Sequence, residues 1–273
     1  MIVICALAKN EEDYINEWVK FHLNIGFDKI YIYDNGNLND EPISKFIDTH
    51  YLNKVEIIDI RGRKEPKLQH HIYSDFYQKY GTTFDWCAFI DIDEFFFGVK
   101  DIKEMCSKAP HYIPQIRVKW KLFGDDDLIE RDMSKPVYEV FKKRVTSSLK
   151  RDLTPNGSLE RQAKCIVRGN LKKVIFYSPH FASYDQRDDV LPSCLPNGRL
   201  LSYSKVVLSD RTYDMDQRVF LHHYMTKSLS EFVKQKLNRN DAVYNEEIGT
   251  TYYWRINKQT KEKLVYLKSL GII

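Results

Sequence analysis

Three carboxylic acids, Asp91, Asp93 and Glu94, lie within four positions directly after the apolar run 86–90. A run of this length and composition predicts a buried strand. Charge at the end of such a strand is costly to bury unless a cation or another partner neutralises it. In an extended backbone Asp91 and Asp93 point to the same side, because they are two residues apart. Two such carboxylates suit Mg²⁺ or Mn²⁺, with substrate phosphates completing the coordination shell.

Strand and helix patterns alternate over the first hundred residues and predict where these acids lie. Apolar segments predict strands at residues 2–7, 29–33, 55–60 and 86–91. Amphipathic segments predict helices at residues 12–25, 42–49 and 69–80. His22 falls on the apolar face of the first helix and is predicted to be a core residue. The alternation predicts an α/β fold with a Rossmann-like, mainly parallel sheet and helices on both faces.

Polar side chains follow all four predicted strands. They are Lys9, Asn10 and Glu11 after the first, Asp34 and Asn35 after the second, Arg61 after the third, and the acids after the fourth. Ligands of open α/β sheets bind beyond the carboxyl ends of the strands. The four strand ends therefore predict one ligand site at this edge. The alternative is that these are solvated loops, which are polar in any case, and that Asp91 and Asp93 belong to an acidic turn.

The chain beyond residue 100 is less regular. Residues 113–119 and 174–177 predict strands, and residues 124–165, rich in charge, predict loops and a mobile segment over the site. Ser228, followed by Glu three residues later, is an N-cap signature that predicts a helix over residues 228–238. No internal repeat or linker is evident, so we expect one domain over residues 1–273.

Composition excludes several classes of protein. The chain has 273 residues and a formal net charge of +4, which is too weak and dispersed to favour nucleic acid as a partner. Its five cysteines lack metal-type spacing and are typical of free thiols in a reducing compartment. The apolar N-terminus is short and precedes its first lysine, so it predicts a strand rather than a signal peptide. We expect a cytoplasmic protein with no bilayer-spanning segment.

The order of these residues resembles that of GT-A glycosyltransferases, most closely glycosyltransferase family 92 and its family-2-like relatives. The resemblance covers roughly residues 2 to 239. The matching pieces are Lys9-Asn10-Glu11, Tyr14-Ile15, Glu17-Trp18, Phe21-His22, Gly26, Ile32-Tyr33-Asp34-Asn35, Gln69, Trp86, Asp91-Ile92-Asp93-Glu94-Phe95, Trp120, Phe123-Gly124, Lys164, Ile166-Val167-Arg168, His180, His223-Tyr224, Thr226-Lys227-Ser228, Glu231-Phe232 and Lys234 or Lys236.

The resemblance implies transfer of a sugar from a nucleotide donor, typically a UDP-sugar, to an acceptor hydroxyl. It implies Asp91 and Asp93 as ligands of Mn²⁺ or Mg²⁺, with His223 as a third metal or diphosphate contact. Such a cation stabilises the charge of the departing diphosphate. Asp34 would face the nucleoside and Lys227 a phosphate. Gln69 and the polar strand ends, Lys9 to Glu11, Asn35 and Arg61, would complete the donor-binding half, residues 1–100.

An inverting transferase also needs a carboxylate that takes the acceptor proton. Asp125 follows Phe123-Gly124, which the resemblance places on the acceptor side, in residues 101–240, and Glu94 is its rival. The run Asp125-Asp126-Asp127 departs from the small polar residues of relatives and is equally typical of a solvated turn. Inversion is thus implied by the family alone.

The implied acceptor is a glycan or lipid-linked oligosaccharide of surface polysaccharide or lipopolysaccharide synthesis at the inner membrane face. Lysines among apolar residues in the C-terminal helical segment, residues 241–273, could touch an anionic membrane, although a plain amphipathic helix explains them too. A sugar nucleotidyltransferase is a rival function, but it would want a Gly-rich loop after the first strand, where Ala8-Lys9-Asn10-Glu11 has no Gly. A non-catalytic nucleotide-sugar or glycan-binding module is the second rival.

Overall fold

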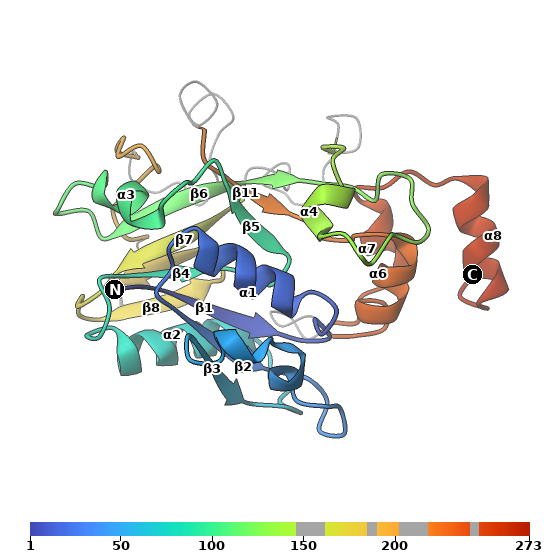
Figure 1. Ribbon diagram of the computed structural model, residues 1–273, viewed down its shortest axis with the longest axis horizontal. Coiled ribbons are helices and arrows are strands. Elements are labelled where there is room, and N and C mark those ends of the chain that lie inside the picture. Colours follow the sequence, from blue (N-terminus) through green and yellow to red (C-terminus); the bar gives the residue numbers. More distant parts are fainter. Residues whose placement is uncertain (146–161, 185–189, 202–217, 241–245) are drawn as a thin grey trace.

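A mainly parallel sheet forms the centre of the molecule (Figure 1). The computed structural model describes residues 1–145, 162–184, 190–201, 218–240 and 246–273. Within them the strand order is β3 (Val55–Asp59), β2 (Lys29–Asp34), β1 (Ile2–Ala8), β4 (Trp86–Phe89), β7 (Ala163–Arg168), β6 (Gln115–Leu122), β11 (Phe220–His223) and β5 (Glu94–Phe97), and β10 (Ser193–Cys194) pairs with β6.

Strand direction divides the sheet into two parts. The strands β1, β2, β3 and β4 are parallel, so their carboxyl ends share one edge. β7 runs antiparallel between β4 and β6, and β11 is parallel to β6 but antiparallel to β5. The predicted α/β class and mainly parallel sheet are confirmed.

Helices cover both faces of the sheet because side chains of each strand alternate between them. Ile2, Ile4 and Ala6 of β1 pack with α1 (Ile15–Asn24), the 3₁₀ helix η1 (Ile43–Phe46) and α3 (Ile102–Ser107). Val3 and Cys5 of the same strand pack with α2 (Leu68–Tyr80) on the opposite face. Two apolar cores therefore enclose β1, as the nearly unbroken apolar sequence of that strand predicts.

Several predicted bounds differ from the structure. The first helix begins at Ile15 rather than residue 12, because residues 12–14 form a turn. The predicted helix 42–49 is two 3₁₀ turns, η1 and η2 (Thr49–Tyr51), and the strand 86–91 ends at Phe89. The strand β5 and the helix α3 were not predicted.

The later elements follow the predictions in part. The predicted strands 113–119 and 174–177 are β6 and β8 (Val174–Ser178), and β8 pairs with β9 (Phe181–Tyr184). Of the predicted loop region 124–165, residues 146–161 lie outside the described residues, while α4 (Val137–Val140) and the start of β7 fall inside it. The helix predicted over 228–238 is α6 (Leu229–Gln235), opened by the expected capping box of Ser228 and Glu231.

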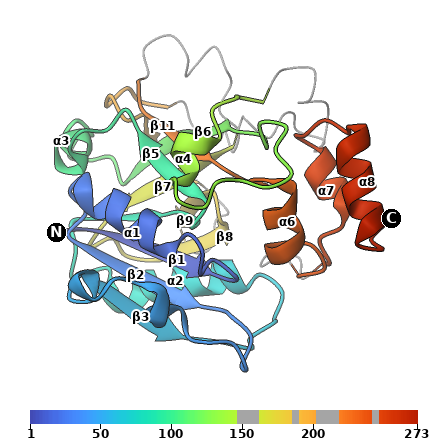
Figure 2. The same cartoon turned by 45° about the vertical axis from the view of Figure 1, so that its right-hand side comes forward.

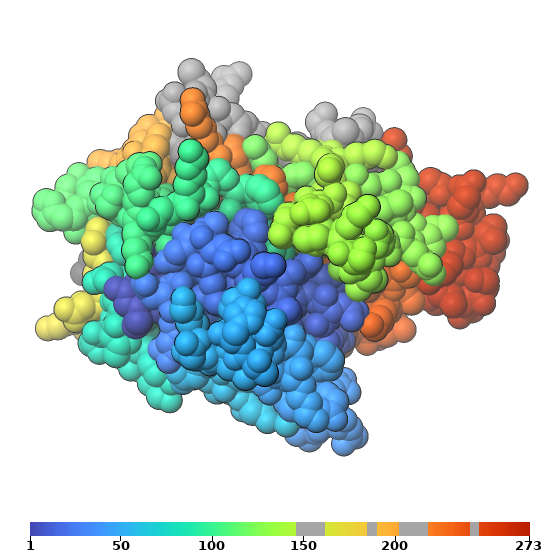
Figure 3. All heavy atoms as spheres, in the orientation of Figure 1, coloured from blue at the N-terminus to red at the C-terminus, as the bar shows by residue number. Residues whose placement is uncertain are grey.

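The C-terminal helices pack together at one end of the molecule (Figure 2). Leu229 and Phe232 of α6, Tyr253 of α7 (Thr250–Trp254) and Leu267 of α8 (Lys261–Ser269) share one apolar cluster. In Figure 3 the C-terminal part of the chain, in red, extends from the body of the molecule beside residues 124–140. Among the described residues, no helix combines the length and apolarity that crossing a bilayer requires. The division of the chain at residues 100 and 240 stays a prediction.

His22 is a core residue, as its position on the helix predicts. Its side chain has no solvent exposure, Nδ1 lies 2.8 Å from the carbonyl oxygen of Trp18, and Phe95 stacks on the ring. Nε2 has no hydrogen-bond partner within the described structure. Burial lowers the pKa of His22 from 6.5 to about 3, so the native state holds this imidazole neutral.

We expect His22 to make the protein less stable in mild acid. The unfolded chain protonates this imidazole below about pH 6.5, whereas the native state does not until about pH 3, so stability falls as pH decreases across that window. The contribution is at most about 1.4 kcal/mol per pH unit. Urea unfolding of wild type and His22→Leu at several pH values from 7 to 4.5 measures it. Equal pH slopes in the two proteins would contradict the assignment.

Candidate active site

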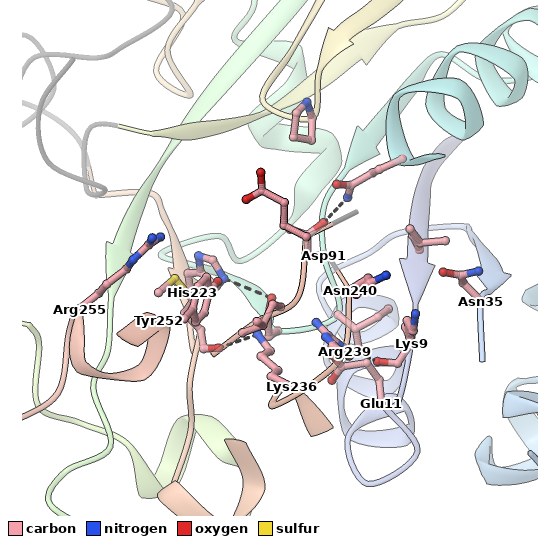
Figure 4. Close-up of a pocket in the computed structure, with 18 of the residues that line it drawn as sticks. Lys9, Glu11, Asn35, Asp91, His223, Lys236, Arg239, Asn240, Tyr252 and Arg255 are labelled. Atoms are coloured by element: carbon pink, nitrogen blue, oxygen red, sulfur yellow. Dashed lines mark hydrogen bonds and ion pairs between the residues drawn. The ribbon is translucent and has the colours of Figure 1, made fainter. Parts of the chain in front are cut away.

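A cavity of about 600 Å³ opens beyond the carboxyl ends of the parallel strands. Its lining comes from the loops after β1, β2 and β4, from the inner strands β6, β7 and β11, and from residues within 236–240 and 246–255 (Figure 4). Of the predicted site residues, seven line it: Lys9, Glu11, Asn35, Gln69, Asp91, Asp93 and His223. The cavity therefore lies at the edge where the sequence predicts a ligand site.

The acids lie in a tight turn between two strands rather than on an extended strand end. β4 stops at Phe89, Ile92 and Asp93 form the turn, and β5 starts at Glu94. The turn is closed by the Glu94 amide, which donates to the carbonyl oxygen of Asp91 at 3.2 Å. Both aspartates still line the cavity, so the turn presents them together.

Asp91 accepts from side chains of two neighbouring elements, α2 and β7. Gln69 of α2 donates from Nε2 to Oδ1 of Asp91 at 2.6 Å, and Lys164 of β7 has Nζ 2.9 Å from Oδ2. The Lys164 side chain is 1% exposed and that of Asp91 is 31% exposed. Burial lowers the pKa of Lys164, but Asp91 and Glu94 more than compensate, and its net pKa is raised. Asp91 thus keeps a buried cation beside it.

Asp93 joins three parts of the chain. Nζ of Lys236, at the end of α6, lies 2.6 Å from Oδ2, and Nε2 of His223 in β11 lies 3.3 Å from Oδ1. The backbone carbonyl of Asp93 accepts from the Tyr224 amide at 2.9 Å. Burial raises the pKa of Asp93, but Lys236 and then His223 lower it well below the usual value. Asp93 is therefore a carboxylate with its charge already compensated.

Glu94 does not line the cavity. It has no solvent exposure, and Oε2 accepts from the Asp91 amide at 2.9 Å, so its carboxyl group supports the turn from behind. Burial raises the pKa of Glu94 well above its usual value. The structure therefore places the predicted rival base inside the protein, next to the acids rather than facing a substrate.

The side chains around Asp91 and Asp93 supply only part of the ligand set that a divalent cation needs. Within the described part of the chain, no three His, Cys, Asp or Glu side chains form a cluster that could hold a metal ion. Asp91 and Asp93 supply carboxylate oxygens at one cavity, which suits a cation that takes its remaining ligands from substrate phosphates. The residues thus fit a cation shared with a phosphate ligand, and they do not form a complete protein cage.

The segment after β1 is bound to α6. Arg239 donates to the Lys9 carbonyl at 2.8 Å, and Asn10, in the left-handed region with φ 57°, donates from Nδ2 to the Gln235 carbonyl at 3.1 Å. Lys227 has Nζ 3.0 Å from Oε2 of Glu11. Asn10 and Lys227 therefore do not line the cavity, although both were predicted to bind the donor.

The two polar residues after β2 have different surroundings. Asp34 accepts from the amides of Gly36 at 3.0 Å and Ile43 at 2.9 Å, so its carboxylate closes the loop after the strand. Asn35 lines the cavity beside Lys9 (Figure 4). Arg61 pairs with Asp59 at 2.8 Å outside the cavity. The structure thus brings Asn35 to the site, but not Asp34 or Arg61.

Asp125, the predicted base, is anchored in the interior on another side. Its Oδ2 lies 2.5 Å from Nζ of Lys263 in α8 and accepts from the hydroxyl of Tyr253 in α7. Asp125 is 3% exposed and does not line the cavity. The carboxylate fastens the C-terminal helices to the loop after β6, which explains why it is not presented to a substrate.

The sequence did not predict one wall of the cavity, which consists of C-terminal residues. Glu246, Glu247, Tyr252 and Arg255 line it, and the Arg255 guanidinium lies 5.4 Å from the Tyr252 ring centroid. No spacing rule connects these residues to Asp91, because tertiary packing brings them there: Glu247 pairs with Asn240 beyond α6, and Tyr252 and Arg255 lie in and directly after α7. Four further residues line the cavity that the family resemblance includes but that were not predicted as site residues: Trp120, His180, Lys164 and Lys236.

The fold and the position of the cavity are those of a GT-A-like α/β protein. The family model described as Glycosyltransferase family 92 matches residues 1–264, and the chain belongs to this family. A glycosyltransferase family 92 protein of Ricinus communis is 27% identical over 132 residues, which are 46% of this chain and 23% of the relative. One of Oryza sativa subsp. japonica is 26% identical over 92 residues, 34% of this chain and 15% of the relative. The chain thus aligns with less than a quarter of either relative.

We expect Lys263→Met to destabilise the protein by about 3 kcal/mol, because it leaves the buried Asp125 carboxylate without its cation. Urea unfolding measures the loss. The double variant Asp125→Asn/Lys263→Met should recover part of it, since no buried charge is then unpaired. Lys261→Met, an exposed position on the same helix, is the matched control and should change stability little. A Lys263→Met protein as stable as this control would show that the pair contributes nothing.

Proposed function

We propose that this protein transfers a sugar from a nucleotide donor, a UDP-sugar, to a hydroxyl of a glycan acceptor, with inversion and with Mn²⁺ or Mg²⁺. One observation carries the proposal: in a family 92 chain, Asp91 and Asp93 share a cavity with several cationic side chains at the edge where parallel strands end. This shared cavity is the observation that supports assigning the site to these residues.

The donor diphosphate is the group that this cavity suits. Lys9, Arg239 and Arg255 line it and supply positive charge for phosphate oxygens. The metal ion, when bound to Asp91 and Asp93, would act as a Lewis acid for the developing charge of the diphosphate. Asn35 and Lys9, at the ends of β2 and β1, mark the part of the cavity that we assign to the nucleoside.

Trp120 is our candidate contact for a sugar. It is 6% exposed, lines the cavity, and its Nε1–H has no hydrogen-bond partner within the described structure. The His180 ring lies 5.1 Å away, and its pKa is lowered by burial and by Lys164, so the ring is neutral. An aromatic face with an unused N–H donor suits a sugar ring and its hydroxyl groups.

The acceptor base is best sought on the C-terminal wall. Glu11, Asp91 and Asp93 line the cavity, but each has a lysine within 3.0 Å. Glu246 and Glu247 also line it and have no ion pair among the described residues. A carboxylate that is free and exposed can accept a proton in the transition state. We therefore propose one of these two as the base, in place of Asp125 or Glu94.

The cellular setting follows from this reaction. We propose a cytoplasmic enzyme that acts on a glycan or lipid-linked oligosaccharide for surface polysaccharide or lipopolysaccharide, with peripheral contact to the inner membrane face. Val265 in α8 and Leu270 directly after it are 57% and 49% exposed, and the same helix carries the exposed Lys261 and Lys268, which supports such contact. The rival nucleotidyltransferase is disfavoured because the segment after β1 is fastened to α6 instead of forming a phosphate loop.

We expect UDP with Mn²⁺ to raise the melting temperature of the wild-type protein by several degrees, because selective binding stabilises the folded state. Asp91→Asn and Asp93→Asn should lose this rise. Asp75→Asn, an exposed carboxylate on α2, is the matched control and should keep it. A thermal-shift series of nucleotides and nucleotide sugars makes the measurement. If UDP with Mn²⁺ raises the melting temperature equally in all four proteins, Asp91 and Asp93 do not belong to the donor site.

Replacing the base should lower kcat by roughly 100-fold or more, and should do so with little effect on UDP affinity. We expect this of either Glu246→Gln or Glu247→Gln, while the other variant serves as its neighbour control. Initial rates with the donor identified by the thermal-shift series give kcat, and calorimetry gives the UDP affinity. If both variants keep the wild-type kcat, the base lies elsewhere.

A further inference from the structure

The two acidic ligands expected for the metal are already paired with buried ammonium groups. Lys164 lies 2.9 Å from Asp91, and Lys236 lies 2.6 Å from Asp93. Their side chains are 1% and 6% exposed, and Lys236 also donates to the Met225 carbonyl at 2.5 Å. The lysines come from β7 and from the end of α6, two elements otherwise far apart in the chain. These contacts are built into the fold and are not loose surface pairs.

Among the described residues that line the cavity, acidic and basic side chains are equal in number. Five basic side chains line it (Lys9, Lys164, Lys236, Arg239 and Arg255), together with five carboxylates (Glu11, Asp91, Asp93, Glu246 and Glu247). The formal charges cancel, and His180, with its lowered pKa, adds none. A bare divalent cation entering this lining would meet ammonium groups beside both aspartates, and like charges at such short distance repel strongly where water is excluded.

A nucleoside diphosphate changes this balance. Its phosphate oxygens offer anionic partners both to a divalent cation and to the ammonium groups beside the aspartates. The cation then arrives with its positive charge compensated, and Mg²⁺ or Mn²⁺ takes part of its shell from the phosphates. A protein site with unpaired carboxylates would have no such requirement and would bind the ion alone.

We propose that Lys164 and Lys236 make the site selective for a metal–nucleotide complex: it rejects the free divalent cation and accepts it only together with a nucleoside diphosphate. The inference rests on the proposed function, because it takes Asp91 and Asp93 as the metal ligands. Lys236 opposes binding of the free cation at Asp93, and Lys164 opposes it at Asp91, unless a nucleoside diphosphate is bound with the cation.

The test is a titration of Mn²⁺, followed by the loss of its free-ion electron paramagnetic resonance signal, with and without UDP. Wild type should bind Mn²⁺ with UDP and should bind it at least about 10-fold more weakly without UDP. Lys236→Met should bind Mn²⁺ alone roughly tenfold or more tightly than wild type does, because the competing ammonium group is gone. Mn²⁺ alone should also raise the melting temperature of this variant more than that of wild type.

Lys234→Met is the matched control, since Lys234 lies on the same helix, is 68% exposed and pairs with Asp13 outside the cavity. It should behave as wild type. If wild type binds Mn²⁺ equally tightly with and without UDP, the inference is overturned. This comparison uses wild type only, so it does not depend on whether Lys236→Met folds. A Lys236→Met protein that still requires UDP would overturn the role of Lys236. If wild type binds UDP neither with nor without Mn²⁺, the proposed donor site itself fails, and the inference fails with it.

Discussion

The ion pair between Asp93 and Lys236 is the contact on which the arrangement of the site depends. It joins the turn between β4 and β5 to the end of α6, while the backbone carbonyl of Asp93 binds the first residue after β11. A buried carboxylate of this kind is tolerated only with a partner close by. α6 and the residues directly after it also bind the segment after β1. The paired carboxylate of Asp93 therefore fixes the β4–β5 turn, the end of α6 and the segment after β1 relative to one another.

Local sequence patterns were enough to predict the elements of the parallel half of the fold, but they did not predict all elements of the other half. The bounds of four elements were predicted to within two residues: β1, β2, β3 and α2. Each has one clear hydrophobic periodicity and ends at a Gly or polar residue. β5 was missed because Glu94 continues the acidic run directly, so that no boundary separates turn from strand. Its pairing with β11, more than a hundred residues later, cannot be read from local pattern.

The same division holds for the site. Asp91 and Asp93 were predicted to lie at the ligand edge because two acids after an apolar strand are unusual by themselves, and Lys9, Glu11 and Asn35 because strand ends share an edge; all five line the cavity. Asp125 was a plausible base only because a sequence does not reveal partners: its lysine comes from the last helix. The C-terminal wall was not predicted for the same reason, since its residues reach the cavity through tertiary packing.

The anchoring of that wall has a consequence for where the cavity tolerates substitution. The C-terminal helices hold to the body through a small apolar cluster and through Lys263 and Asp125, away from the aspartates that face the cavity. Exposed residues between these anchors, such as Thr251, lie outside the sheet, so substitutions there should leave the fold intact. The lining of the cavity on this side can then be altered by an exchange of side chains, while the attachment of the wall stays the same.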